Sequence, residues 1–321
     1  MKITTLIPAY KPKYLVELLT AIRNQTVKPD KIIISDDSPD EAFLKAMSSS
    51  PIKNAVADLN IQTLRGPCQG AEVNFHFLLN IFQQQASTEL FHLQFDDDIP
   101  YPSFYDKHIN VHRTHDIRCS VSRRWTASDF GQPIRDLPVP TAIDQSAHHL
   151  ISLNSKMLFE HTAGLSSNWL GEFSNAVFHS SMAPELDDTR LAGISFGGLE
   201  DIGGFLKASL HRPIAYINDH LGFFRISAEH RSADPMGRAL KMAHLAYIAL
   251  ALAGRDLKQL SPIQCSNVLR NLCPIIEARY GLEADMRNIC GLMPALGRGD
   301  DGAETRFLQE WNIYSTNVES Q

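Results

Sequence analysis

The first 122 residues alternate short apolar runs with longer segments of helical periodicity, and this alternation constrains the fold more than any other feature. The apolar runs, rich in β-branched residues, cover 3–8, 31–35, 61–64, 89–95 and 117–122. The segments with apolar residues on one helical face cover 14–25, 40–47, 70–85 and 103–115. Strands that alternate with helices form parallel sheets with helices on both faces. The sequence therefore predicts an α/β fold with a mostly parallel central sheet flanked by helices.

The second half of the chain is less regular. Residues 124–195 lose the alternation and carry prolines, histidines and the segment Asn168-Trp-Leu-Gly-Glu-Phe-Ser174, which resembles a substrate-shaping insert. Beyond them we expect a helix at 201–210, strands at 213–217 and 221–226, and helices at 236–253, 266–280 and 305–311. We therefore place one domain at 1–232 and a helical C-terminal extension at 233–321.

Charge and cysteine content exclude several classes of protein. The formal net charge is −6, from 30 Lys+Arg against 36 Asp+Glu, which lacks the basic excess of a nucleic-acid-binding protein. The five cysteines form no CxxC pair, so neither a disulfide framework nor a structural zinc site is expected, and reduced thiols indicate a cytoplasmic protein. The longest apolar stretch, 239–253, contains Lys241 and His244 and is too short to span a bilayer. Peripheral contact at the inner face of the membrane stays open, as does oligomerisation through the C-terminal helices.

Carboxylates follow two of the predicted strands directly. Asp96, Asp97 and Asp98 come after the strand at 89–95, and Asp36 and Asp37 come after the strand at 31–35. Ligands bind outside the carboxyl ends of the strands in sheets of this type. Adjacent carboxylates stay ionised only when they are solvated or paired with a cation, and oxygen ligands suit Mg²⁺ or Mn²⁺. The alternative for each group is a polar turn or helix cap, which alone is the better reading of 36–40.

A second acidic pair, Glu200 and Asp201, lies among glycines in the segment 197–204. Acidic residues are common in the first turn of a helix because of the helix dipole, and that alternative accounts for one of the two. It does not account for the glycines, which leave room for another group to approach closely.

Taken together, these segments resemble family 2 glycosyltransferases of the GT-A fold over roughly residues 3–232. That family typically has an apolar strand, Pro-x-Tyr, a helix ending in Asn-Gln-Thr and a strand ending in Asp-Asp. The corresponding segments here are Leu6-Ile-Pro-Ala-Tyr10, Asn24-Gln-Thr26 and Ile32-Ile-Ile-Ser-Asp-Asp-Ser38, followed in order by Phe95-Asp-Asp-Asp98, Asn168-Trp-Leu-Gly-Glu172, Glu200-Asp201 and Leu221-Gly-Phe-Phe-Arg225. The resemblance implies a Rossmann-like GT-A domain that binds a nucleotide sugar.

The resemblance also implies roles for the acidic residues. In the donor site, Pro8, Ala9 and Tyr10 would line the nucleobase pocket, and Asp37 would accept a hydrogen bond from the base. Asp96 and Asp97 would approach the ribose or the metal, and Asp98 would be the main ligand of a divalent cation, Mn²⁺ or Mg²⁺. Asp201 would be the general base, supported by Glu200. The acceptor would be a glycan, a lipid-linked or a protein-linked hydroxyl, and the configuration would invert because no second nucleophile is evident.

The sequence departs from the family pattern at one helix. Arg-Asn is common there, whereas this chain has Val73-Asn74, so a contact to phosphate is missing. Some relatives use a histidine near the closing strand as a metal ligand; His220 and His230 lie there, although packing or surface roles are the commoner ones for histidine.

Other functions remain as alternatives. A sugar-nucleotide nucleotidyltransferase shares the general architecture, but it would carry a glycine-rich loop where this chain has Ala9-Tyr-Lys-Pro12. A dinucleotide-dependent oxidoreductase would need GxGxxG after a strand, and none follows one here. A catalytically inactive GT-A-like interaction module is the third alternative.

Overall fold

The computed structural model describes residues 1–85, 88–226 and 234–316, and these form two compact units. The first unit comprises Met1–Leu153, Leu170–Asp188 and Ala208–Ile226. The second unit comprises Asn154–Trp169, Thr189–Lys207 and the C-terminal part of the chain from Ser227. The domain boundary predicted at 232/233 lies outside the described residues and stays a prediction.

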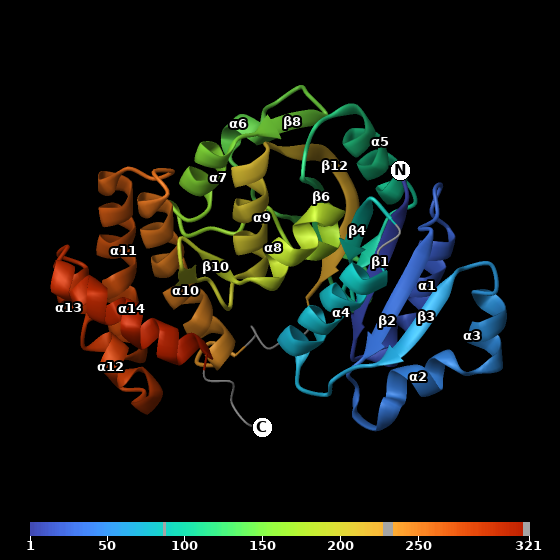
Figure 1. Ribbon diagram of the computed structural model, residues 1–321, viewed down its shortest axis with the longest axis horizontal. Coiled ribbons are helices and arrows are strands. Elements are labelled where there is room, and N and C mark those ends of the chain that lie inside the picture. The colour runs from blue at the N-terminus through green and yellow to red at the C-terminus, as the bar shows by residue number, and fades with distance from the viewer. Residues whose placement is uncertain (86–87, 227–233, 317–321) are drawn as a thin grey trace. The chain divides into compact units, whose positions relative to one another are not determined.

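A mixed sheet with a parallel half forms the centre of the first unit (Figure 1). Its strands run in the order β3 (Ile61–Arg65), β2 (Lys31–Asp36), β1 (Ile3–Ala9), β4 (Leu90–Leu93), β9 (Ala176–His179), β6 (Cys119–Ala127), β12 (Ile214–Arg225) and β5 (Ile99–Pro100), with β7 (Pro133–Asp136) on β6 and β8 (Leu150–Leu153) on β12. Strand β1 pairs in parallel with both β2 and β4. The predicted α/β class is confirmed, and the carboxyl ends of these three strands share one edge.

Amphipathic helices cover this sheet because their apolar faces match its apolar strands. Helix α1 (Leu15–Arg23) buries Leu15, Leu18, Leu19 and Ile22 against residues of β1 and β2. Helix α5 (Phe104–Thr114) contributes Phe104, Tyr105 and Ile109 to a second cluster that includes residues of β1, β4 and β9. The remaining α-helices of this unit are α2 (Ala42–Met47), α3 (Ser50–Ala55), α4 (Ala71–Gln85), α6 (Thr141–Asp144) and α8 (Ala183–Asp187).

The second unit is mainly helical. Its elements are α7 (Ser155–His161), β10 (Arg190–Leu191), β11 (Ile194–Ser195), α10 (Arg238–Asp256), α11 (Pro262–Tyr280), α12 (Arg287–Cys290), α13 (Met293–Leu296) and α14 (Asp301–Thr316). Helix α9 (Glu200–His211) contributes residues 200–207. Trp311 is buried and donates its indole N–H to the carbonyl of Ser195 at 2.8 Å. Lys241 is 5% exposed and pairs with Glu283 and Asp285, which ties α10 to the segment before α12.

Several predicted elements differ in extent from the observed ones. The strands predicted at 213–217 and 221–226 are one strand, β12, whose pairing with β6 shifts register on either side of His220. The helix predicted at 305–311 extends over Asp301–Thr316. The irregular segment 124–195 contains short strands and helices whose pairing partners lie far away in sequence, and such pairings leave no local periodicity to recognise.

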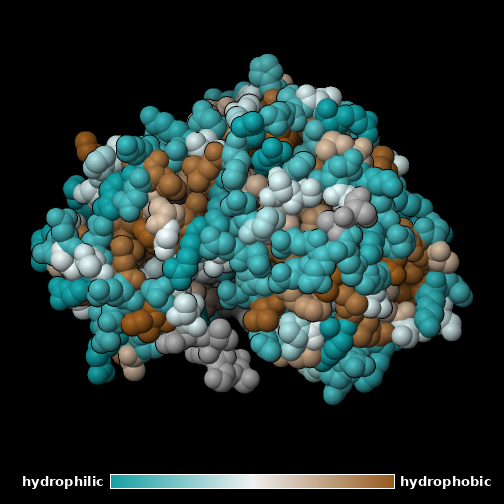
Figure 2. All heavy atoms as spheres, viewed as in Figure 1, coloured by the Kyte–Doolittle hydropathy of each residue, from teal (hydrophilic) through white to brown (hydrophobic). Residues whose placement is uncertain are grey.

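The surface of the helical unit is mixed in character. Figure 2 shows brown, apolar areas among teal ones over α10 and α11. Ile263, Ile275 and Leu282 are exposed large apolar residues of this region. Within the described ranges, no helix combines the length and the apolar character that crossing a bilayer requires.

Candidate active site

Hydrogen bonds to Asp96 connect the segment after β4 to the segment after β1. The carboxylate oxygen Oδ2 of Asp96 accepts the backbone N–H groups of Tyr10 and Lys11, each at 2.6 Å. Asp96 is 7% exposed, and burial raises its pKa to about 6, with a further contribution from neighbouring Asp97. Two backbone donors therefore hold this carboxylate at the shared edge of the sheet, as the parallel arrangement predicted.

Arg225, the last residue of β12, organises the next two aspartates. Its backbone N–H donates to Oδ1 of Asp98 at 3.1 Å, and its Nε donates to the carbonyl of Asp97 at 2.9 Å. Its side chain is 1% exposed, pairs with Glu17 of α1 at 2.8 Å, and lies 4.1 Å from the ring of Tyr14. The guanidinium thus connects the acidic triplet to the start of α1.

Asp98 is the most buried member of the triplet, at 1% exposure. Its second oxygen, Oδ2, has no hydrogen-bond partner among the described residues. Burial raises its pKa well above the ordinary value, and the negative charges of Asp97 and Glu172 add to that shift. Glu172 in turn forms an ion pair at 2.6 Å with Arg124, which is 5% exposed.

The two aspartates at the end of β2 both accept backbone N–H groups. Asp36 is fully buried and accepts the backbone N–H groups of Ser38 and Leu44, so it caps the turn, as the alternative reading anticipated. Asp37 is 8% exposed and accepts the backbone N–H groups of Cys68 at 2.5 Å and Gly70 at 3.0 Å. Its carboxylate fixes the loop that precedes α4.

The three residues predicted to line the nucleobase pocket differ in exposure. Tyr10 is 53% exposed, Pro8 is half-buried, and Ala9 is fully buried in the apolar cluster under α1. Of the three, Tyr10 therefore offers the largest surface to a ligand, and its aromatic ring suits stacking on a base. The assignment of this pocket stays a prediction.

Glu200 and Asp201 begin α9 and belong to the second unit. A carboxylate oxygen of Glu200 accepts the backbone N–H of Gly198 at 2.6 Å. Gly198 has a φ of +91°, and a Cβ there would lie 2.6 Å from Cβ of Met242; a Cβ at Gly203 would overlap the ring of Phe196. The groups that approach these glycines are therefore apolar side chains of the same unit, so local packing accounts for the glycines.

His220, one of the two histidines considered as metal ligands, packs against an aromatic ring. His220 stacks on Trp125 with ring centroids 3.9 Å apart, and its Nε2 bonds Asp136 at 3.0 Å. His230 lies outside the described residues. In α4, Asn74 is 2% exposed and donates to the carbonyl of Ser35, so it fixes the helix to β2.

The donor set at the triplet fits a hard divalent cation. Asp97, whose side chain is 15% exposed, is adjacent to Asp98, whose buried Oδ2 lacks a hydrogen bond. Mg²⁺ and Mn²⁺ are commonly held by one or two carboxylates together with substrate phosphates. No group of three or more His, Cys, Asp or Glu with metal-binding geometry occurs within residues 1–85, 88–226 and 234–316.

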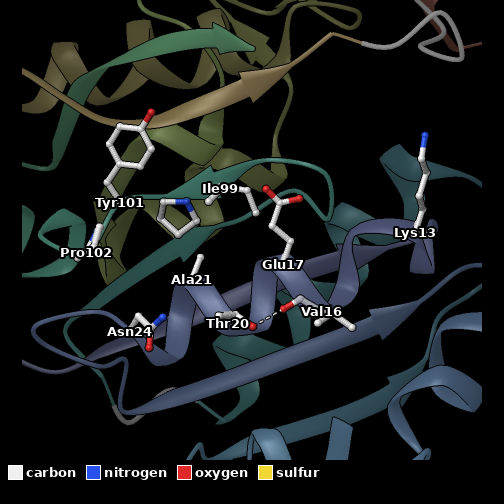
Figure 3. A pocket seen from close by; sticks show the side chains of 10 residues that line it. Lys13, Val16, Glu17, Thr20, Ala21, Asn24, Ile99, Tyr101 and Pro102 are labelled. Carbon is white, nitrogen blue, oxygen red and sulfur yellow. Dashed lines mark hydrogen bonds between the residues drawn. The ribbon is translucent and has the colours of Figure 1, made fainter. Parts of the chain in front are cut away.

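One cavity of the first unit is lined by residues other than the acidic triplet. It has a volume of about 530 Å³ and lies between α1 and the segment Ile99–Pro102 (Figure 3). Its walls include Val16, Thr20 and Tyr101, and Glu17 points toward it. None of the predicted site residues lines it.

Two basic residues near the triplet were given no role by the sequence patterns. The side chain of Lys11 lies 4.0 Å from Asp97, and Arg225 contacts both Asp97 and Asp98. Lys11 follows Tyr10 in the first motif, and Arg225 ends the closing-strand motif. Their positions within these motifs could have indicated a role at the site. Their contacts with Asp97 and Asp98, however, arise only when distant segments of the chain come together in the fold.

Comparisons with known proteins identify the fold. No protein-family model matches the chain, and no curated protein matches it by sequence. The structure of S. aureus TarS residues 1–349 in complex with UDP-GlcNAc is 13% identical, with a TM-score of 0.53 over 98% of this chain and 90% of that one. Another structure of S. aureus TarS matches at 14% identity and a TM-score of 0.53 over 98% of this chain, and this chain spans 55% of the length of that one.

A third structure agrees. The mannosyltransferase PcManGT from Pyrobaculum calidifontis, in complex with GDP-Man and Mn²⁺, is 11% identical, with a TM-score of 0.52 over 98% of this chain and 85% of that one. Likeness at this level of identity establishes architecture, and architecture alone does not establish activity. The chain has the GT-A fold, as the motifs predicted.

Proposed function

We propose that the protein is an inverting glycosyltransferase that moves a sugar from a nucleoside-diphosphate donor to an acceptor hydroxyl, in the synthesis of a bacterial surface glycan or glycoconjugate. One observation carries the proposal. Asp96 is bonded to the end of β1, with Asp97 and Asp98 beside it, at the edge where the neighbouring strand β2 presents Asp37. The GT-A structures that hold UDP-GlcNAc, and GDP-Man with Mn²⁺, support a nucleotide sugar as the donor.

In this proposal the first unit binds the donor. Tyr10 stacks on the nucleobase beside Pro8, with the buried Ala9 between them in sequence, and Asp37 accepts a hydrogen bond from the base. Asp96 and Asp97 would approach the ribose or the metal. Asp98 would be the main ligand of a divalent cation, Mn²⁺ or Mg²⁺, which would supply positive charge beside the leaving diphosphate. The structural support is the position of these carboxylates at one edge of the sheet.

The chemical step is a single displacement at the anomeric carbon. The acceptor hydroxyl oxygen forms the new bond as the bond to the diphosphate oxygen breaks, and that oxygen keeps the electron pair. Asp201, supported by Glu200, takes the hydroxyl proton. Because the acceptor attacks opposite the leaving group, the configuration inverts.

Nucleotide binding tests the proposal most directly. Calorimetric titration with UDP, GDP and dTDP, each with and without Mn²⁺, should show one base preferred and tighter binding with metal. A screen of sugar nucleotides for hydrolysis would then identify the sugar, and NMR of the product would give its anomeric configuration. Binding of none of the three nucleotides would contradict the proposal and favour an inactive module, whereas consumption of a nucleoside triphosphate with a sugar 1-phosphate would indicate a nucleotidyltransferase.

A further inference from the structure

The basic side chains near the acidic triplet differ in whether they already form hydrogen bonds within the protein. Lys13 donates to Asp129 at 2.7 Å. Arg225 is enclosed, with its guanidinium on Glu17 and on the carbonyls of Asp97 and Asp129. The ammonium of Lys11 makes no hydrogen bond to any described residue, and it lies 4.0 Å from Oδ2 of Asp97, beyond hydrogen-bonding distance.

The backbone of Lys11 is fixed on both sides. Its N–H donates to Asp96 at 2.6 Å, and Pro12 follows as the first residue of a short 3₁₀ helix. The side chain is 26% exposed, so the ammonium is accessible to a ligand in solution. A long flexible stem on a fixed backbone lets a lysine exchange one anionic partner for another nearby.

An anionic ligand at this edge needs a cation from the protein. The triplet itself is acidic, and Val73 of α4 carries no charge. Asn74 beside it is buried and bonded to Ser35, so it supplies no charge. A diphosphate would meet repulsion from the carboxylates unless Lys11, a divalent cation or both offset it.

We propose that Lys11 is a diphosphate-binding residue. Its ammonium lies beside Asp97 and moves to a phosphate oxygen when a nucleoside diphosphate binds. The inference rests on the proposed function, and the position of Lys11 beside the acidic triplet supports it.

The exchange predicts effects of opposite sign on two ligands. In Lys11→Met, the affinity for the nucleoside diphosphate in EDTA falls by about tenfold to a hundredfold, since a charge-assisted contact is lost. The affinity of the nucleotide-free protein for Mn²⁺ rises by about threefold to tenfold, because a positive charge beside Asp97 is gone. Binding of the nucleoside without phosphates is unchanged.

The experiment uses the full chain. Calorimetry with UDP, GDP and dTDP in EDTA, NMR line-broadening with uridine, guanosine and thymidine, and electron paramagnetic resonance of Mn²⁺ would be run on wild type, Lys11→Met, Lys11→Arg and the matched control Lys13→Met. Lys11→Arg should keep most of the diphosphate affinity, and Lys13→Met should behave as wild type. Thermal melting checks that each variant is folded.

The possible outcomes separate the two proposals. If the wild type binds none of the three diphosphates, either in EDTA or with Mn²⁺, the proposed function fails and this inference fails with it. If it binds one of them only with Mn²⁺, the inference alone is wrong, because the metal then supplies the positive charge. If the wild type binds one of them and Lys11→Met binds it equally well, the inference alone is wrong. Equal losses in Lys11→Met and Lys13→Met would also overturn it, because that result indicates general surface charge.

Discussion

Three adjacent carboxylates in one turn have three different surroundings in this protein. Asp96 accepts two backbone N–H groups, and Asp97 lies beside Lys11. Asp98 is buried and accepts the backbone N–H of Arg225. Burial and mutual repulsion raise the pKa of Asp96 and of Asp98, so a nearby cation would favour the charged form of each. Chemically identical side chains are thus differentiated by their neighbours.

At the same scale, the proposed role of Asp201 as the general base can be tested by replacing its carboxylate with an amide. Asp201→Asn should lower transfer by a factor of about 10² to 10⁴, because general-base catalysis is lost, while the affinity for donor stays near that of wild type. Steady-state kinetics and calorimetry measure the two effects. Asp301→Asn is a matched control, because Asp301 also lies in the first turn of a helix of the second unit. Wild-type turnover in Asp201→Asn would show that another group is the base.

At the scale of elements, the end of β12 is held against α1 and the turn after β4. Arg225 contributes its N–H to Asp98 and its guanidinium to Glu17 and to two carbonyls, those of Asp97 and Asp129. Tyr14 and Lys13 bond the side chain of Asp129, which fixes the loop after β6 to the same place. One buried arginine therefore aligns segments that are distant in sequence.

Replacing Arg225 should affect both stability and the acidic turn. Arg225→Met should lower the free energy of unfolding by about 2–4 kcal/mol, because buried carbonyls and Glu17 lose their donor. It should also weaken nucleoside-diphosphate binding in the folded fraction, since the carbonyl of Asp97 is no longer held. Denaturant unfolding and calorimetry measure the two effects.

Arg123→Met is the control for this substitution. Arg123 is also a poorly exposed arginine of the first unit, at 12%, and it pairs with Asp136 and Asp144 rather than with the triplet. It should lower stability without changing nucleotide binding. If both variants reduce nucleotide affinity equally, Arg225 has no particular part in positioning the acidic turn.

At the scale of the whole molecule, three buried histidines make stability depend on pH. Burial lowers the pKa of His92 to about 3 and of His112 to about 4, and it lowers the pKa of His108 well below its ordinary value. His92 and His112 donate to the carbonyls of Ser174 and Val177. All three side chains are therefore neutral in the folded protein at pH 7.

Acidification should consequently destabilise the fold well above the pH at which most carboxylates titrate. The unfolded chain takes up protons near pH 6.5, whereas the folded state does not take them up until about pH 4 or below, so stability is full above pH 6.5 and falls as pH decreases. From pH 7.5 to 5.5 each of these histidines should lower the stability by about 1 kcal/mol. The raised pKa of Asp96 and of Asp98 opposes this loss, because the folded protein takes up those protons before the unfolded chain does. Denaturant unfolding at a series of pH values measures it.

A single substitution checks the origin of this dependence. His112→Gln removes one of the three sites while keeping a side-chain donor for the carbonyl of Val177, so the loss of stability from pH 7.5 to 5.5 should be smaller by about 1 kcal/mol. His148→Gln, at an exposed position, should leave it unchanged. A pH dependence unaffected by His112→Gln would mean that other groups cause it.

The sequence by itself determined the parallel strands at the start of the chain, the helices between them and the position of acidic residues after β2 and β4. These features follow from local periodicity and from the rule that parallel strands end at one edge, so neighbouring residues suffice to predict them. The same reasoning gave β12 as two strands, because the register shift around His220 arises from its pairing with β6.

Tertiary structure alone decided how each acidic residue is used. Asp36 became a turn cap, Asp98 became buried with an oxygen lacking a partner, and Lys11 came to lie beside Asp97. Each outcome depends on contacts between segments far apart in sequence, such as β12 with the turn after β4. Burial and charge pairing are properties of those contacts, and no local pattern encodes them.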